Sequence, residues 1–441
     1  MSSRNLWFLL ASLGGLLLVL ASYSNSFHQS FHLSDQQVIQ HNLYVQGIDS
    51  IPHLFSDPRK SFNLSAQVPY RPVLSLSFSF DHWMAGGLDP RQFHLTQFIL
   101  VAFLGLAFAA FCQFILDRAC HHWSNKYIAL VAALWCCIHF ANAEMLNEIS
   151  SRASLLATLG VVGSFVMYGG FPACRPSQVY LLPMMFGALA HPLGVLFAPL
   201  LFVYGLLFEK KLSCSEMFTA HAWPKVRHAL GKTLPAFLTG MGLLLFLDSV
   251  IPFQKTGGVL SVEALLAQPA LWLDYLHRFI FPMGVTHDMA WQVSLPVVDI
   301  RFVGGIICTI FLGRMVWECS RQKELRPVAF GIMWFMLGVF SLGHSGNPEK
   351  WMSQPQVLFP FMGLMLALMA WIAYRLRRWR RSSPLRFSLM IPVVLLSGVL
   401  VLCVHAVGTY QLHEHGFSKE SYPELRNVRT QSPSRQALEN S

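Results

Sequence analysis

Acidic, basic and histidine side chains gather in one long segment between the first two apolar runs. The segment extends from Phe31 to Gln97 and contains Asp35, Arg71 and His94. A carboxylate can accept the proton of an attacking hydroxyl group, and an arginine fork matches the geometry of a phosphate. Beside long apolar helices, this combination indicates chemistry on a substrate carried by a lipid.

Further polar residues stand at the ends of later apolar runs. The segment HFANAEMLNEISSR contributes His139, Asn142, Glu144 and Arg152, and the segment YLHRFIF contributes Tyr275 and Arg278. If these ends face the same side of a membrane, the residues can converge on one site.

Each candidate also has a purely structural interpretation. Arg152 lies four residues after Glu148, the spacing of an ordinary ion pair on a helix surface. Asp35 could cap a helix, and the sequence Tyr70-Arg71-Pro72 could mark a turn that enters a helix. His94 and His139 could bind carbonyl groups at helix ends.

The composition decides the class of protein that must position these residues. Apolar residues make up 54% of the 441 residues, charged residues make up 12%, and the mean hydropathy is +0.46. A soluble domain carries about twice that share of charge. Eleven runs approach the length that crosses a bilayer: near 6–22, 95–116, 127–141, 153–169, 178–190, 192–208, 234–251, 301–317, 328–343, 356–374 and 387–407. The sequence therefore predicts an all-α polytopic membrane protein with about 11 transmembrane helices.

The distribution of Lys and Arg predicts the orientation. If the N-terminus is cytoplasmic, most of the 32 basic residues but few of the 22 acids face the cytoplasm, including the cluster from Arg375 to Arg386. Large outer loops then span residues 24–94 and 252–300. The membrane domain covers residues 1–411, and a polar tail at 412–441, expected to be disordered, lies outside. The basic clusters indicate contact with anionic lipid, not with nucleic acid.

Cysteine usage adds little to this prediction. None of the nine cysteines falls in the two outer loops, and no pattern of zinc ligands occurs. We therefore predict no disulfide framework and no zinc site.

Three motifs in register resemble a known family of membrane enzymes. They match the transmembrane and tetratricopeptide-repeat group of the GT-C glycosyltransferases, in which an acidic first outer loop is followed by YRPL…SF, GLxPxxFHL and an HPxNxE…ISxR motif. The matching residues here are Phe31, Asp35, Asn42, Tyr70, Arg71, Pro72, Ser77, Phe78, Gly87, Leu88, Pro90, Phe93, His94, Leu95, His139, Asn142, Glu144, Ile149, Ser150, Arg152, Tyr275, Arg278 and Pro282.

The resemblance implies transfer of a sugar from a polyprenyl-phosphate-linked donor to a hydroxyl group at the outer membrane face. Asp35 would be the catalytic base, and Arg71, Arg152 and Arg278 would bind the donor phosphate and its carrier. Supporting roles would fall to the side chains of His94, His139, Asn142, Glu144, Tyr70 and Tyr275. These residues require no cofactor, and the question of whether a divalent metal takes part stays open. The partners would be the lipid-linked sugar, membrane lipid and a protein or glycan acceptor, and the location would be the bacterial inner membrane.

The sequence also departs from the family pattern. Ser34 replaces the first of the paired acids, the sequence around His191 replaces a Lys-Glu pair, and Gln354-Pro355-Gln356 replaces Glu-Arg-Tyr. No tetratricopeptide repeats follow the last apolar run. The alternative prediction is therefore a catalytically inactive relative that binds lipid-linked sugar or scaffolds envelope proteins. A transporter is disfavoured because the runs contain few polar breaks.

Overall fold

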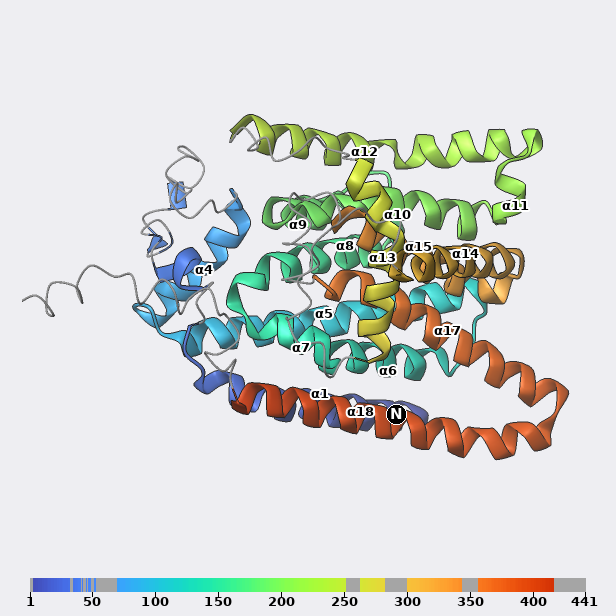
Figure 1. Ribbon diagram of the computed structural model, residues 1–441, viewed down its shortest axis with the longest axis horizontal. Helices are drawn as coiled ribbons and strands as arrows, with labels where there is room; N and C mark the ends of the chain where they lie inside the picture. Colours follow the sequence, from blue (N-terminus) through green and yellow to red (C-terminus); the bar gives the residue numbers. More distant parts are fainter. Residues whose placement is uncertain are drawn as a thin grey trace, which may run out of the picture.

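The computed structural model describes residues 3–31, 35–40, 70–250, 262–281, 300–342 and 356–415, and a few isolated positions between 42 and 52. Within this part of the chain, every regular element is helical, and most of the long helices run side by side (Figure 1). The predicted class, an all-α polytopic membrane protein, is confirmed.

Eleven apolar helices correspond to the eleven predicted runs. Nine of the described helical segments are long and apolar enough to cross a membrane, and two shorter apolar helices cover residues 125–138 and 181–190. The eleven are α1 (Ser3–Tyr23), α5 (Pro90–Ala119), α6 (Asn125–Ile138), α8 (Arg152–Gly170), α9 (Leu181–Ala190), the η7–α10–η8 segment (Pro192–Glu209), α12 (Trp223–Val250), α14 (Ile300–Arg321), α15 (Arg326–Leu342), α17 (Leu358–Ser382) and α18 (Pro384–His415).

Small residues allow the helices to pack closely. A methyl group built on Gly331 of α15 would lie 2.4 Å from the carbonyl oxygen of Gly363 on α17, and one on Gly160 of α8 would lie equally close to the carbonyl of Pro183 on α9. Between membrane helices, such close approach is a main source of packing energy. The sequence of small residues therefore determines which helices are neighbours.

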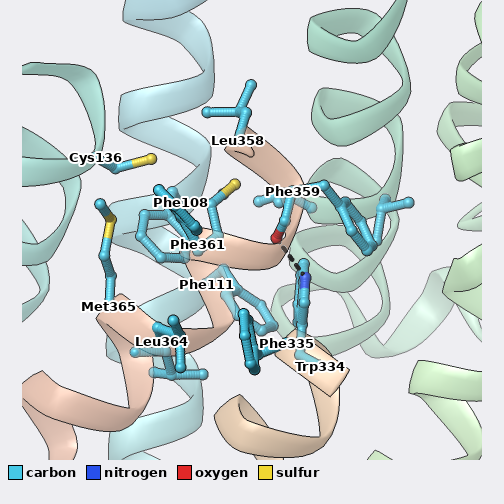
Figure 2. Close-up of a cluster of buried hydrophobic side chains, with 14 of the residues drawn as sticks. Phe108, Phe111, Cys136, Trp334, Phe335, Leu358, Phe359, Phe361, Leu364 and Met365 are labelled. Atoms are coloured by element: carbon cyan, nitrogen blue, oxygen red, sulfur yellow. Dashed lines mark hydrogen bonds between the residues drawn. The ribbon is translucent and has the colours of Figure 1, made fainter. Parts of the chain in front are cut away.

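Aromatic side chains fill the centre of the bundle. Trp334 of α15 is fully buried and donates a hydrogen bond from Nε1 to the carbonyl oxygen of Phe359, 2.9 Å away. Figure 2 shows this bond beside Phe111 of α5 and Phe335. The bond holds the first turn of α17, and with it the residue Gln356 that precedes the helix.

The long segment between the first two apolar runs contributes a helix to one end of the bundle. This helix, α4 (Pro72–Ala85), begins with proline at a position where no backbone donor is needed and ends at Gly86, whose φ of 67° suits glycine. It packs against α5 and α9, and in Figure 1 it lies at the end of the bundle opposite the connection between α17 and α18.

The long loop at residues 252–300 contains an amphipathic helix. It is α13 (Val262–Ile280), which runs across the long helices and packs on α14 and α15 (Figure 1). The remaining loop residues, 252–261 and 282–299, include Pro282 and lie outside the described part of the chain.

The predicted tail begins later than expected. Residues 412–415 still belong to α18, so the boundary drawn at 412 cuts through a helix. The rest of the tail, 416–441, lies outside the described residues.

Candidate functional site

Two polar groups occupy the α4 end of the bundle. The first, which we call the Arg152 network, consists of Arg152, Asp81, Thr96, Gln97 and Ser77. The second, the Arg71 cluster, consists of Arg71, His191, Gln356 and Tyr275. They differ in how many hydrogen-bond acceptors the protein provides for the arginine of each group.

The Arg152 network is a closed system of hydrogen bonds. The side chains of Arg152 and Asp81 are fully buried, and Arg152 Nη1 lies 2.5 Å from Asp81 Oδ2. Arg152 also donates to Gln97 Oε1 at 3.1 Å, and to the carbonyl oxygen of Phe93 at 2.8 Å. Thr96 donates to the second oxygen of Asp81 at 2.6 Å. The guanidinium thus joins α8 to α4 and α5 and has several internal acceptors.

Asp81 was not identified from the sequence. Burial raises the pKa of its carboxyl group, and the neighbouring Arg152 acts in the opposite direction. The helix pair Glu148–Arg152 expected from their spacing is replaced by this pairing across helices. The available signal was an acid inside the otherwise apolar helix segment SLSFSFDHWM, because an unpaired acid there would be costly to bury.

Asp35 lies next to the Arg152 network. Its side chain is fully buried, and its Oδ1 accepts a hydrogen bond of 2.7 Å from the backbone N–H of Ser150, at the start of the helical turn that leads into Arg152. It is also within electrostatic reach of Arg152. The structure therefore brings two of the predicted site residues together.

Arg71 is placed differently, at the residue before α4. Its Nε is buried and has no hydrogen-bond partner among the described residues. Burial lowers the pKa of the guanidinium to about 10, so the group still carries its charge at neutral pH. A buried donor without an acceptor is unfavourable, and an anion bound at this Nε would remove the cost.

Residues from three distant parts of the chain form the rest of the cluster, and His191 is within electrostatic reach of Arg71. His191 lies in the turn between α9 and η7, where its Nδ1 accepts from the backbone N–H of Leu193 at 3.2 Å. Its Nε2 lies 3.4 Å from Nε2 of Gln356. Burial and the neighbouring Arg71 lower the pKa of His191 well below its ordinary value. The imidazole is therefore neutral, and Arg71 provides the positive charge of the cluster.

Tyr275 closes the cluster from α13. Its side chain is buried, and its hydroxyl oxygen faces the backbone N–H of Gln356. Burial raises the pKa of this phenol, so it stays protonated. One turn further along α13, Arg278 pairs with Asp274 through a contact of 2.8 Å between Nε and Oδ2.

The remaining predicted residues have structural contacts. Fully buried His139 stacks on Phe279 and on His405, with ring centroids 5.5 and 4.6 Å apart. Asn142 donates to the carbonyl oxygen of Cys136 at 2.9 Å, which satisfies the end of α6. His94 is buried in α5, Tyr70 is buried next to Arg71, and the side chain of Glu144 lies outside the described residues.

The described residues contain no group of three or more His, Cys, Asp or Glu side chains that could hold a metal ion.

The helix α4 connects the two groups. Arg71 precedes the helix and Asp81 lies ten residues later, which corresponds to about 15 Å of helix rise. Arg71 therefore stands before the first turn of α4, and Asp81 lies towards its other end.

The fold and these groups define an α-helical membrane protein with a polar site at one end of its bundle. This chain is similar to protein O-mannosyl-transferase TMTC3 of Homo sapiens, with 22% identity over 432 residues, covering 92% of this chain and 42% of that protein. Protein O-mannosyl-transferase Tmtc3 of Drosophila melanogaster is 22% identical over 406 residues, covering 78% of this chain and 42% of that protein. The predicted resemblance to this group is confirmed.

A shorter match links the chain to protein O-mannosyl-transferase TMTC2 of Homo sapiens, which is 27% identical over 163 residues, or 36% of this chain and 18% of that protein. The chain spans less than half the length of the relatives that it matches. No family model and no solved structure matches it.

Proposed function

We propose that this chain is a membrane glycosyltransferase that takes a sugar from a polyprenyl-phosphate-linked donor and transfers it to a hydroxyl group. The observation that carries the proposal is the buried Nε of Arg71, which has no hydrogen-bond acceptor among the described residues. Relatives named as protein O-mannosyl-transferases support a mannosyl donor and a protein acceptor.

The Arg71 cluster suits the phosphate of the donor. Arginine binds phosphate oxygens through paired hydrogen bonds, and neutral His191 and the amide of Gln356 offer further donors beside it. A buried site strengthens each of these interactions, because little water screens them. Positive charge is needed there most when the phosphate leaves, since it then gains negative charge.

Asp35 suits the acceptor side of the reaction. The acceptor oxygen attacks the anomeric carbon, the bond from that carbon to the phosphate oxygen breaks, and the phosphate leaves with the electron pair. The proton of the acceptor hydroxyl passes to the Asp35 carboxylate. The hydrogen bond from Ser150 N–H fixes that carboxylate, and a positioned carboxylate typically contributes about 10²–10⁴-fold to such a rate.

The other arginines take secondary roles in this proposal. Arg278 lies one turn from Tyr275 on α13 and can contact the carrier where it enters from the lipid. Arg152 supports Asp35 through the network, because a phosphate could bind its Nη1 only by replacing Asp81. The face of the membrane, the bacterial inner membrane and the cytoplasmic N-terminus stay predictions from the sequence.

A transfer assay in lipid nanodiscs tests the proposal. Purified protein would receive radiolabelled polyprenyl-phosphate mannose and a mixture of serine- and threonine-containing peptides. We expect label in peptide for the wild type and at least a hundredfold less for Asp35→Asn at equal protein level. No transfer by the wild type to peptide, glycan or lipid acceptors would contradict the proposal.

The second candidate function is binding of a lipid-linked sugar without transfer. It is favoured by His191 and Gln356, because these uncharged side chains adjoin Arg71 where the resembling family has charged residues. Under this alternative the wild type would bind the donor, and neither the wild type nor Asp35→Asn would transfer the sugar.

A further inference from the structure

A basic cleft lies at the opposite end of the bundle from the candidate site. It measures about 430 Å³ and is formed by the short helix η11 (Lys323–Leu325) and the last turns of α17. Its lining includes the cations Lys323, Arg378 and Arg381 and the single carboxylate Glu324. The lining therefore carries more positive than negative charge.

The hydrogen bonds of the cleft leave two of its cations without a carboxylate. Arg381 Nη1 lies 3.4 Å from Glu324 Oε1. Arg378 donates instead to the hydroxyl of Tyr374 at 3.0 Å, and that hydroxyl donates to Gln322 at 3.2 Å. Within the described chain, no carboxylate lies within ion-pair distance of Lys323 or Arg378. An anion can therefore bind between them without displacing an internal partner.

Tryptophans mark this end of the bundle as a membrane interface. Trp371 is 43% exposed and lies on α17, three residues before Tyr374, so it occupies the same face of the helix as Tyr374 and Arg378. The guanidinium of Arg375 lies 5.8 Å from the Trp371 ring and 5.1 Å from the Trp379 ring. On α14, Arg321 similarly lies 5.4 Å from Trp317. Tryptophan prefers the headgroup level of a bilayer.

We propose that this cleft binds the phosphate headgroup of an anionic membrane lipid. The phosphate lies between Lys323 and Arg378, the Tyr374 hydroxyl is within reach of the headgroup oxygens, and an acyl chain follows the helix past Trp371. Basic clefts between membrane helices commonly bind such headgroups. The distribution of Lys and Arg predicts that this face is cytoplasmic, where anionic lipids are enriched.

A free phosphate ion would meet the same cations, but the exposed Trp371, one turn before Tyr374 on α17, favours a lipid. A soluble anion gains nothing from Trp371, whereas a lipid also buries an acyl chain against it. The two sources therefore differ in how strongly each competes for the cleft.

Lipid titration followed by native mass spectrometry tests the proposal on the whole chain. The probe is short-chain phosphatidylglycerol added to protein in phosphatidylcholine nanodiscs. The variant Arg378→Gln/Arg381→Gln removes two cations of the cleft, and Lys225→Gln/Arg227→Gln removes two exposed cations from the same predicted face. All four side chains are exposed, and equal melting temperatures would show that both variants fold.

We expect the cleft variant to bind phosphatidylglycerol about tenfold more weakly or worse, because each basic residue near an anionic headgroup contributes about 1 kcal/mol. The Lys225/Arg227 variant should stay within about twofold of the wild type. Equal weakening in the two variants, or none in the cleft variant, would overturn the proposal. If inorganic phosphate at an equal concentration displaced the lipid, the ligand of the cleft would be free phosphate and the proposal would be wrong.

Discussion

Arg71, at the residue before α4, and Arg152, the first residue of α8, differ in what the protein provides for them. Arg152 is fully buried and has acceptors on α4 and α5, including the carboxylate of Asp81. Arg71 has a buried Nε with no acceptor among the described residues, and it adjoins a neutral histidine. An internally satisfied arginine holds a fold together, whereas an unsatisfied one is suited to bind a ligand.

The largest effect is expected at Arg152. Arg152→Met leaves Asp81 buried without its cation, and breaking a buried pair in this way costs about 3–5 kcal/mol. We expect little folded protein in membranes, measured by fluorescence-detected size-exclusion chromatography of a tagged chain.

The double variant Asp81→Leu/Arg152→Met is the control for that experiment. It removes both charges, so no unpaired carboxylate remains, and the yield should recover in part. Equal yields of the single variant and the wild type would contradict the structural role of Arg152.

A large loss of activity at unchanged stability is expected at Arg71. Arg71→Gln removes a cation without leaving an internal partner unpaired, so the melting temperature should stay within about 2 °C, corresponding to less than 1 kcal/mol. Loss of a preorganised donor to a developing charge typically costs about 10²–10³ in rate. A transfer assay and a thermal melt on the same preparation would measure both. A large fall in stability would show that Arg71, like Arg152, holds the fold together.

Asp35→Asn should separate chemistry from binding. The amide keeps the shape of the carboxylate and can still accept from Ser150 N–H, but it cannot take the acceptor proton. We expect transfer to fall about 10²-fold or more, while the affinity for the donor changes little. Unchanged transfer would remove Asp35 as the base.

Gln356→Glu should weaken the binding of the lipid-linked donor, by a smaller factor than the changes above. The new carboxylate would stand beside His191, where its negative charge would repel the phosphate of the donor. About a tenfold rise in the KM for the donor is expected, consistent with the usual cost of an unfavourable charge. The isosteric Gln356→Met, which adds no charge, should show a smaller change.

The smallest effect concerns the aromatic cluster around His139. Burial, with a smaller contribution from His405, lowers the pKa of His139 to about 3. The unfolded chain binds this proton below about pH 6.5 and the folded chain does not, so stability falls as the pH decreases from about 6.5 toward 3. The melting temperature should decline over this range, and less steeply in His139→Phe. The exposed His121→Gln is the control and should retain the decline of the wild type.

The sequence predicted the helices more fully than the site. Each apolar run corresponds to a helix, because a continuous run of apolar residues is enough to predict a helix that crosses the hydrocarbon layer. The boundary at 412 was placed too early, because polar residues at the end of α18 continue the helix.

The site depends on contacts that no local pattern encodes. Arg71, His191, Tyr275 and Gln356 come from four separate parts of the chain and meet only through the packing of α4, α9, α13 and α17. The spacing of Glu148 and Arg152 suggested a helix pair, but burial of Arg152 made Asp81 the better partner. The family motifs brought Asp35 and Arg71 to attention, and the packing places Asp35 beside Arg152 of α8 and Arg71 at the residue before α4.

The central claim is that Arg71 binds the phosphate of a lipid-linked donor, and a direct binding measurement tests it. The dissociation constant of polyprenyl phosphate without a sugar would be measured in nanodiscs for the wild type and for Arg71→Gln. We predict at least a tenfold weaker affinity for the variant, at an unchanged melting temperature. The same affinity in both proteins would contradict the claim.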